Sequence, residues 1–387
     1  MNLSARMSNF ELSATIKIAD HVAELERMGE KILNLSTGAP HFPTPPSIVT
    51  ATMQALRENK TGYSDSRGIY QLRKRLCDYY NEQFGTNLKP EENILITPGG
   101  KQAILYCMLS LLEPGDEVLI PSPAWVSFAE IVKIAGGIPV TVDCNSENDF
   151  EFSLEQIQKV VTKKTKALII NSPCNPTGKI IKSNLLNDIH QFCKKNNIFV
   201  FSDEIYDKIV FSGYEHSSLL QVDQTLQNSV ILNGFSKTYA MTGWRLGYII
   251  GPSELIDGMV KLQQNSVTCP TTFIQFGVLN GFDECKSFPQ HALNSYQENR
   301  DFLLKEFESL KNFRLIKPEG AFYGFIDVSK LSTDSVDFCF QLLNTCKVAA
   351  VPGVAFGNSG EGFIRISFAT SKDALAEFVR RIRAIWG

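Results

Sequence analysis

The sequence of 387 residues has no marked excess of either charge and no long apolar run. Its 38 Lys and Arg residues nearly balance 41 Asp and Glu residues, which gives a formal net charge of -3. A chain without a basic excess gives no reason to expect nucleic acid or an anionic membrane as a partner. No apolar run reaches the roughly 18 residues of a membrane helix, and residues 1–20 lack the apolar core of a secretory signal. These features predict a soluble, cytoplasmic protein that acts on small molecules.

Cysteine and histidine are present, but not in the patterns of metal sites or disulfide frameworks. The nine cysteines are odd in number, scattered, and never spaced as Cys-x-x-Cys. The five histidines form no cluster in the sequence. This distribution favours a reducing compartment and argues against a bound metal.

What the sequence does contain is a repeated alternation of apolar strands and helix-length segments. Short aliphatic runs occur at 94–97, 117–120, 138–142, 167–171, 198–202, 229–233 and 248–251. Segments of helical length, such as 102–112 and 183–196, separate most of them. The alternation predicts an α/β fold with a seven-stranded, mostly parallel sheet between helices. In such folds ligands bind at the carboxyl ends of the strands.

The length of the chain predicts two domains, or one large domain with a smaller one appended. We expect a large domain over 45–275 and a smaller α/β domain built from both chain ends, 1–44 and 276–387. A helical period over 13–31 and a last amphipathic helix at 374–386 belong to the smaller domain.

The stretch 233–248, NGFSKTYAMTGWRLGY, carries the most specific chemistry. Lys237 follows an apolar strand that ends in a turn of small residues, where the backbone can approach a ligand closely. Lysine forms Schiff bases with carbonyl cofactors, and an arginine such as Arg245 holds phosphate in a bidentate fork. Together the two residues suggest pyridoxal phosphate.

The segment SKTYAMTGWRLGY resembles the pyridoxal-lysine motif of class I aminotransferases, which are fold type I pyridoxal-phosphate enzymes. Among these, the motifs of the chain are most similar to those of bacterial aspartate aminotransferases. The resemblance implies that Lys237 holds pyridoxal 5'-phosphate as a Schiff base. It also implies that Ser236 and Arg245 bind the cofactor.

A glycine pair, Gly99 and Gly100, follows the run 94–97 and opens a helix. Free N–H groups at a helix start bind phosphate, and the pair matches the phosphate-cradling turn of the family. The next residue, Lys101, has three interpretations: a charge on the phosphate, a contact to the distal carboxylate of a substrate, or a solvent-facing side chain. A lysine in this motif meets the acidic side chain in some bacterial aspartate aminotransferases, and this resemblance favours a dicarboxylic substrate.

Four further residues match the family's contacts to the cofactor ring. The resemblance implies that Trp125 stacks on the ring and that Asn175 and Tyr206 donate to its phenolic oxygen. Asp203 directly follows four apolar residues, where an unpaired charge would be costly, and a pyridinium nitrogen would keep it ionised. Without the resemblance, Trp125 would be a core residue, Asn175 a turn residue before proline, and Asp203 a helix cap.

The expected substrate site lies near both ends of the chain. The resemblance implies that Gly38 and Arg365 bind the substrate carboxylate. Without it, Gly38 would be a turn glycine and Arg365 would pair with an acid at the edge of the core. The family has acidic residues close to this glycine, and this chain has Ala39 and His41 instead. Tyr63 matches a tyrosine that reaches the cofactor phosphate of a neighbouring subunit, which implies a homodimer with shared active sites.

We therefore expect an aminotransferase with ping-pong kinetics that passes the amino group of an L-amino acid, aspartate, to a 2-oxo acid, 2-oxoglutarate. The freed amine of Lys237 would carry the α-proton of the substrate. Aminotransferases for aromatic or other neutral amino acids, and pyridoxal-phosphate carbon-sulfur lyases, are alternatives because they need nearly the same residues. A ligand-sensing domain of a transcription regulator is disfavoured, because we see no room for a basic helix-turn-helix before Gly38.

Overall fold

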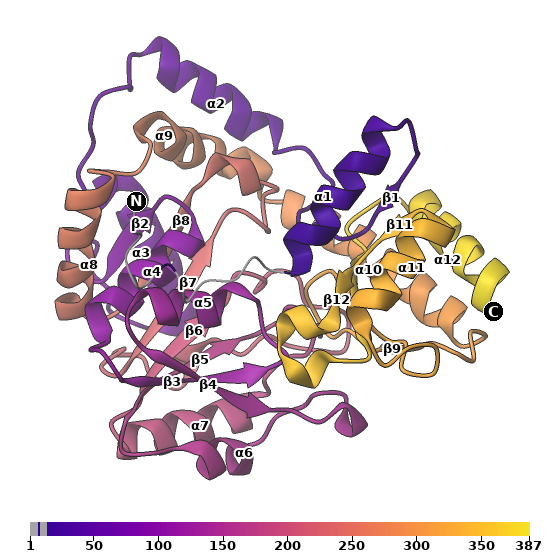
Figure 1. The fold of residues 1–387 in the computed structure, drawn as a ribbon. Coiled ribbons are helices and arrows are strands. Elements are labelled where there is room, and N and C mark those ends of the chain that lie inside the picture. The colour runs from indigo at the N-terminus through magenta and orange to yellow at the C-terminus, as the bar shows by residue number, and fades with distance from the viewer. Residues whose placement is uncertain (1–6, 8–13) are drawn as a thin grey trace.

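The computed structural model describes residue 7 and residues 14–387, with side chains from residue 19 onward in the first helix. Residues 1–6 and 8–13 of the expected small domain therefore lie outside the described residues. A larger unit built on a broad sheet lies beside a smaller unit that contains the C-terminus (Figure 1).

The larger unit has a seven-stranded sheet in the order β2-β8-β7-β6-β5-β3-β4. Its strands are β2 (Ile94–Thr97), β3 (Glu117–Ser122), β4 (Ile138–Asp143), β5 (Thr165–Asn171), β6 (Phe199–Asp203), β7 (Ser229–Gly234) and β8 (Gly247–Ile250). Only β8 runs antiparallel to its neighbours, β2 and β7. The predicted mostly parallel sheet and its seven strands are confirmed. Strand β3 is longer than predicted because Pro121 and Ser122 still pair with β4.

Helices cover both faces of this sheet, because successive strand residues point to opposite sides and the residues on both sides are mostly apolar. Ile94 and Ile96 pack in one core cluster with α3 (Tyr70–Phe84) and α7 (Ser183–Lys195). Leu95, between them, packs in another cluster with α4 (Gly100–Leu111), α5 (Ser127–Ile134) and α8 (Ser253–Ser266). The three strand residues are fully buried. The larger unit is thus a three-layer arrangement.

The smaller unit combines segments from both chain ends. It contains β1 (Leu33–Asn34), β9 (Arg314–Ile316), β10 (Tyr323–Asp327), β11 (Val348–Ala349), β12 (Val351–Pro352), β13 (Phe363–Ser367), α1 (Ala14–Arg27), α10 (Phe288–Phe307), α11 (Ser335–Cys346) and α12 (Lys372–Trp386). Strands β12, β13, β10 and β9 form an antiparallel sheet, and β1 pairs in parallel with β11. One core cluster joins Val22 and Leu35 to Phe338 and Phe378. The expected α/β unit made from both chain ends is therefore present.

The remaining helices connect these layers. They are α2 (Pro46–Arg57), α6 (Leu154–Val160), α9 (Thr272–Gly281) and the 3₁₀ turns at Ser146–Asn148, Leu219–Gln221, Thr242–Trp244, Asp283–Cys285, Gly353–Phe356 and Asn358–Gly360. Helix α9 lies along α2 in Figure 1. The close approach requires glycine: a Cβ on Gly281 would lie 2.6 Å from the Cα of Ile48. Helix α9 spans residue 275, so the proposed domain boundary there falls inside a helix.

Candidate active site

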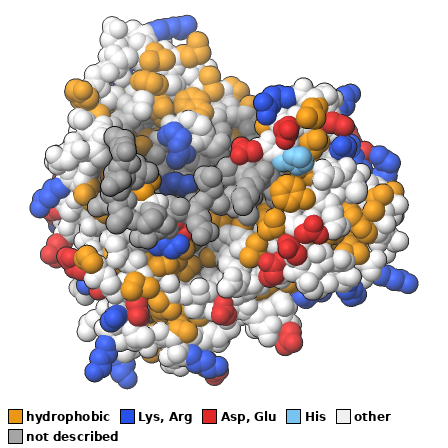
Figure 2. Space-filling view, in the orientation of Figure 1, with side chains coloured by type: hydrophobic (Ala, Val, Ile, Leu, Met, Phe, Trp, Pro, Cys, Tyr) orange, Lys and Arg blue, Asp and Glu red, His pale blue; other side chains and the backbone are white. Residues whose placement is uncertain are grey.

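A cavity of about 590 Å³ lies between the carboxyl ends of the parallel strands and the smaller unit. Figure 2 shows blue Lys and Arg side chains in the hollow at the centre of the molecule. The cavity is lined by eleven of the thirteen predicted site residues: Gly38, Gly100, Lys101, Trp125, Asn175, Asp203, Tyr206, Ser236, Lys237, Arg245 and Arg365. Gly99 does not line the cavity but lies against the guanidinium of Arg245, which does. Tyr63 does not line it, and its side chain is 86% exposed.

Lys237 follows β7 and points into the cavity. Its Nζ donates a hydrogen bond to the backbone oxygen of Gly38 and lies 5.8 Å from the centre of the Tyr206 ring. Burial lowers the pKa of Lys237 to about 8, and the nearby charge of Arg365 acts in the same direction. Near neutral pH a measurable fraction of the Nζ atoms is therefore unprotonated and available as a nucleophile or base.

Asp203 ends β6 at the floor of the cavity and is only 4% exposed. Its Oδ1 accepts a hydrogen bond from the backbone N–H of Ile205 at 3.1 Å. Turns follow it, so the interpretation of Asp203 as a helix cap is wrong. Burial raises its pKa to about 7, although Lys237 opposes the rise. A buried carboxyl with this one hydrogen bond would pair favourably with a cationic group inside the cavity, because such a partner would keep the carboxyl ionised.

Arg365 lies in the middle of β13 and is 6% exposed. It donates to Asn175 Oδ1 at 3.1 Å and to the backbone oxygen of Ser36 at 2.6 Å. Its guanidinium lies 4.5 Å from the centre of the Tyr323 ring and 5.1 Å from that of Phe356.

The charge of Arg365 has no counter-ion among the described residues, and its buried Nε has no hydrogen-bond partner there. The alternative of an arginine paired with an acid at the edge of the core is therefore wrong for this part of the chain. A buried guanidinium without a counter-ion is suited to a planar carboxylate from a bound ligand.

One end of the cavity is built for an anion. Gly99 has a left-handed φ of +83° and precedes α4, whose first residue, Gly100, lines the cavity. A Cβ on Gly99 would collide with the guanidinium of Arg245, and a Cβ on Gly247 would lie 2.7 Å from the backbone nitrogen of Gly100. Glycine at these positions lets the arginine and the helix start approach each other. With Ser236 they could hold a phosphate group.

Trp125 and Lys101 form one wall of the cavity. Trp125 packs edge-to-face on Phe128, with ring centres 5.3 Å apart. The exposed Lys101 places its Nζ 5.1 Å from the centre of the Trp125 ring. Burial of part of the side chain and the charge of Arg245 lower the pKa of Lys101. Its ammonium therefore lies near both the flat face offered by Trp125 and the anion end.

Three of the cavity residues that were not predicted from the sequence make contacts within the site. Tyr323 has its Oη 2.7 Å from that of Tyr206, and Phe356 covers Arg365. Asn171 ends β5, accepts from the backbone N–H of Asn175 at 2.9 Å, and donates to the backbone oxygen of Asp203 at 3.0 Å. All three lie in apolar or turn-like sequence, and no local signal separates them from core or loop residues.

The two unusual residues after Gly38 differ in position. Ala39 lines the cavity, whereas His41 does not. The His41 ring packs on Phe42, with ring centres 4.0 Å apart, and lies 6.0 Å from Tyr296. His41 is therefore a packing residue in this structure.

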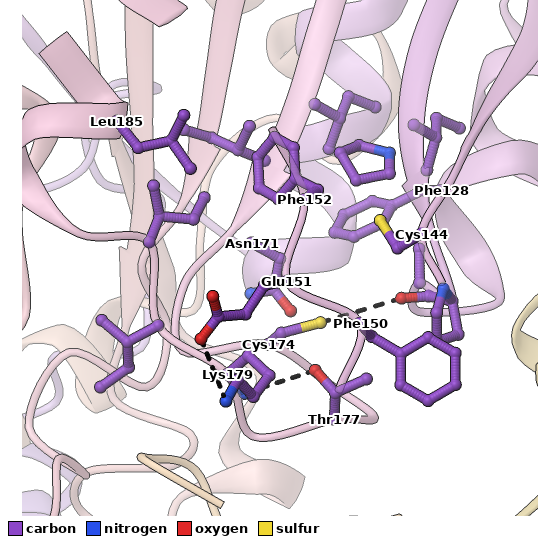
Figure 3. Close-up of a pocket in the computed structure, with 18 of the residues that line it drawn as sticks. Phe128, Cys144, Phe150, Glu151, Phe152, Asn171, Cys174, Thr177, Lys179 and Leu185 are labelled. Carbon is purple, nitrogen blue, oxygen red and sulfur yellow. Dashed lines mark hydrogen bonds and ion pairs between the residues drawn. The ribbon is translucent and has the colours of Figure 1, made fainter. Parts of the chain in front are cut away.

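A second, smaller cavity of about 80 Å³ lies behind the loop that carries Asn175 (Figure 3). Its mostly apolar wall includes Phe128, Phe150 and Cys174, and Lys179 lies at its edge. Lys179 Nζ pairs with Glu319 at 2.8 Å and with Glu151 at 3.6 Å. The pair with Glu319 is nearly buried and joins the asparagine loop to the segment that leads into β10.

No group of three or more His, Cys, Asp or Glu side chains that could hold a metal ion occurs among the described residues. In that same part of the chain, no helix is long and apolar enough to cross a membrane.

Comparisons with known proteins identify the family of the chain. The model of the family described as aminotransferase class I and II matches residues 30–382. The chain is 37% identical to an aspartate aminotransferase of Pyrococcus abyssi, over 100% of this chain and 98% of that protein. It is 36% identical to aromatic-amino-acid aminotransferase 2 of Thermococcus litoralis, over the same shares. The structure of Thermus thermophilus aspartate aminotransferase with maleate superposes with a TM-score of 0.93 at 35% identity, over 99% of each chain. The chain belongs to the class I and II aminotransferase family.

Proposed function

We propose that this aminotransferase takes the amino group of aspartate, passes it to 2-oxoglutarate, and uses pyridoxal 5'-phosphate as its cofactor. The observation that carries the proposal is a single cavity that joins three groups: the partly buried amine of Lys237, the buried carboxyl of Asp203, and the buried guanidinium of Arg365. A base, a partner for a ring cation and a carboxylate receptor are what amino-group transfer from an amino acid requires.

The residues present fit this cofactor. The start of α4, Ser236 and Arg245 would hold the phosphate. Asp203 would face the ring nitrogen, because its buried carboxyl needs a cation. Pyridoxal phosphate supplies an aldehyde that accepts an amino group and a ring that withdraws electrons from the α-carbon of the substrate.

The ring would be held between side chains from several strands. Trp125 offers a flat aromatic face, and Asn175 and Tyr206 would donate hydrogen bonds to the phenolic oxygen. The Asn175 Oδ1 already accepts from Arg365, so its amide Nδ2 is the atom left to donate. This geometry connects the cofactor end of the site to the carboxylate end.

Lys237 would hold the aldehyde and later move a proton. Its pKa of about 8 allows Nζ to act as a base near neutral pH. Nζ would take the proton from the α-carbon of the substrate and return it to the carbon that bore the aldehyde. A second substrate, a 2-oxo acid, would run the same steps in reverse, so the kinetics should be ping-pong.

Arg365 would bind the α-carboxylate common to all amino acid substrates. Lys101 would then meet the distal carboxylate of aspartate, because its ammonium is exposed at the cavity wall without an ion pair among the described residues. The relative solved with maleate, a dicarboxylate, supports this assignment. An aromatic donor is the second candidate, since a relative of equal coverage is named for aromatic amino acids.

We also propose a cytoplasmic homodimer in which each copy completes the site of the other. Tyr63 supports this idea, because its side chain is 86% exposed and lies outside its own cavity. The nine unpaired cysteines fit a reducing cytoplasm. A large domain over 45–275 and a small domain from 1–44 and 276–387 remain our proposal for the organisation of each copy.

The direct test is a panel of amino donors with 2-oxoglutarate, read for the 2-oxo acid product and for ammonia. Aspartate should give the highest kcat/KM and no ammonia. If phenylalanine gives the highest kcat/KM instead, the preferred donor is aromatic and the assignment of aspartate is wrong. Release of ammonia with pyruvate from a cysteine-like donor would instead indicate a carbon-sulfur lyase.

A further inference from the structure

Tyr206 and Tyr323 place their hydroxyl groups against each other in the wall of the cavity. The two Oη atoms are 2.7 Å apart, and the residues are 3% and 1% exposed. Tyr206 belongs to the turn after β6, whereas Tyr323 begins β10 of the smaller unit. The contact therefore joins the two units at the cavity.

One hydrogen bond between two hydroxyls uses only one of the two protons. Among the described residues, neither hydroxyl has another hydrogen-bond partner. If Tyr323 donates, the proton of Tyr206 is free to point into the cavity. If Tyr206 donates, its proton is occupied and it can only accept from a ligand.

The position of Arg365 favours Tyr323 as the donor. Its guanidinium lies 4.5 Å from the centre of the Tyr323 ring, and a cation over a phenol makes that phenol a stronger acid. Burial raises the pKa of both tyrosines, and Arg365 is the main opposing cause at Tyr323 but only a minor one at Tyr206. The stronger acid of a pair is the better donor.

The backbone of Gly38 lies close to the Tyr323 hydroxyl and leaves little space around it. A Cβ at position 38 would lie 2.8 Å from the Tyr323 Oη. Gly38 thus leaves room for the hydroxyl, while its backbone oxygen accepts from Lys237. The hydroxyl of Tyr323 is held at one place by the ring of Tyr206, the backbone of Gly38 and the charge of Arg365.

We propose that Tyr323 is a positioning residue that donates to Tyr206 and so turns the Tyr206 proton toward the phenolic oxygen of the cofactor. This inference rests on the proposed function, in which Tyr206 contacts that oxygen. A hydroxyl that accepts a hydrogen bond becomes a better donor. Tyr323 therefore strengthens a bond that favours the ionised phenolic oxygen, and it lowers the pH at which the visible absorbance of the bound cofactor changes.

The test is a spectrophotometric pH titration of the cofactor-loaded enzyme. Tyr206→Phe should raise the apparent pKa of the absorbance change by about 1 to 2 pH units, as expected for a lost hydrogen bond to a charged group. Tyr323→Phe keeps the aromatic ring over Arg365 and removes only the hydroxyl, and it should raise this pKa by about 0.2 to 0.6 pH unit. The double variant should titrate like Tyr206→Phe alone, because Tyr323 acts through Tyr206.

Tyr296→Phe is the matched control. Tyr296 is buried in the same aromatic cluster, but its Oη has no partner among the described residues, so its loss should leave the titration unchanged. If Tyr323→Phe leaves the apparent pKa of the absorbance change unshifted, or shifts it also in the Tyr206→Phe background, the role of Tyr323 is wrong but the proposed function is not affected. A wild-type enzyme that develops no visible absorbance with pyridoxal phosphate would overturn the proposed function as well.

Discussion

Replacing Arg365 by alanine should reduce kcat/KM for every amino acid substrate, whatever its side chain. The guanidinium is 6% exposed and forms no ion pair with the described residues, so it is the buried charge that an α-carboxylate would neutralise. Removing one partner of a buried, hydrogen-bonded charge pair costs about 2 to 5 kcal/mol, which corresponds to a loss of about 30-fold to several thousand-fold. Arg365→Lys should retain part of the activity, because it keeps the charge but not the fork.

Lys101 supplies the contrasting arm of this experiment. Its side chain is exposed, and a partly solvated ion pair contributes about 1 kcal/mol or somewhat more. Lys101→Met should therefore lower kcat/KM for aspartate by about 5- to 30-fold and leave the value for phenylalanine nearly unchanged.

The assay is steady-state kinetics with aspartate and phenylalanine as donors and 2-oxoglutarate as acceptor. Arg365→Ala should affect both donors by similar factors, and Lys101→Met should affect only aspartate. Equal losses for the two donors after Lys101→Met would refute the assignment of Lys101 to the distal carboxylate. A normal kcat/KM in Arg365→Ala would refute the carboxylate site itself.

Three further predictions concern stability, the phosphate end and pH. Lys179→Met leaves the buried Glu319 without its partner and should lower the free energy of unfolding by ~3 kcal/mol in a denaturant titration. Lys133→Met removes one partner of a half-exposed pair and should lower the free energy of unfolding by less than about 1 kcal/mol. In Gly99→Ala the new side chain would have an unfavourable positive φ and would clash with Arg245. The variant should bind pyridoxal phosphate more weakly in a spectroscopic titration, and its free energy of unfolding should fall by about 1 to 3 kcal/mol. Gly258→Ala, whose new Cβ would be in ordinary contact with Ser110, should change neither quantity. The pKa of Asp203 is raised to about 7, so the free energy of unfolding of the cofactor-free protein should fall as pH rises from 4 to 7, by ~4 kcal/mol at most. Asp203→Asn should remove this dependence of stability on pH. An unchanged dependence in Asp203→Asn would contradict the raised pKa.

The sheet could be predicted from the sequence because its strands are short apolar runs of the kind that only a doubly covered sheet buries. Ile94 and Ile96 face one helical layer and Leu95 faces the other, which is why residues 94–96 are all apolar. The end of β3 could not be placed, because proline usually ends a strand. Pro121 continues this one since β4 pairs alongside it.

The candidate site could be predicted where a chemically conspicuous residue follows a strand. Asp203 stands out because a charge directly after an apolar run needs a reason, and Lys237 stands out because it lies in a turn of small residues after a strand. Tyr323 does not stand out: it lies among aromatic residues in a buried strand, and its hydroxyl gains a partner only because folding brings it to Tyr206, 117 residues away in sequence.

Lys179 and Glu319 do not stand out in the sequence either, because they are 140 residues apart and pair only in the fold. His41 is the converse case. It is conspicuous in the sequence beside Gly38, but its ring packs on Phe42 and lies outside the cavity. Sequence reasoning could identify which residue types suit the chemistry, but it could not tell which way each one points.

Reduction of the cofactor-loaded enzyme with borohydride, followed by peptide mapping, shows which residue holds pyridoxal phosphate. We expect one pyridoxyl group per chain, attached to Lys237, and loss of the visible absorbance on reduction. A label on another lysine, or a reduced enzyme with no label, would rule out Lys237 as the residue that holds the cofactor.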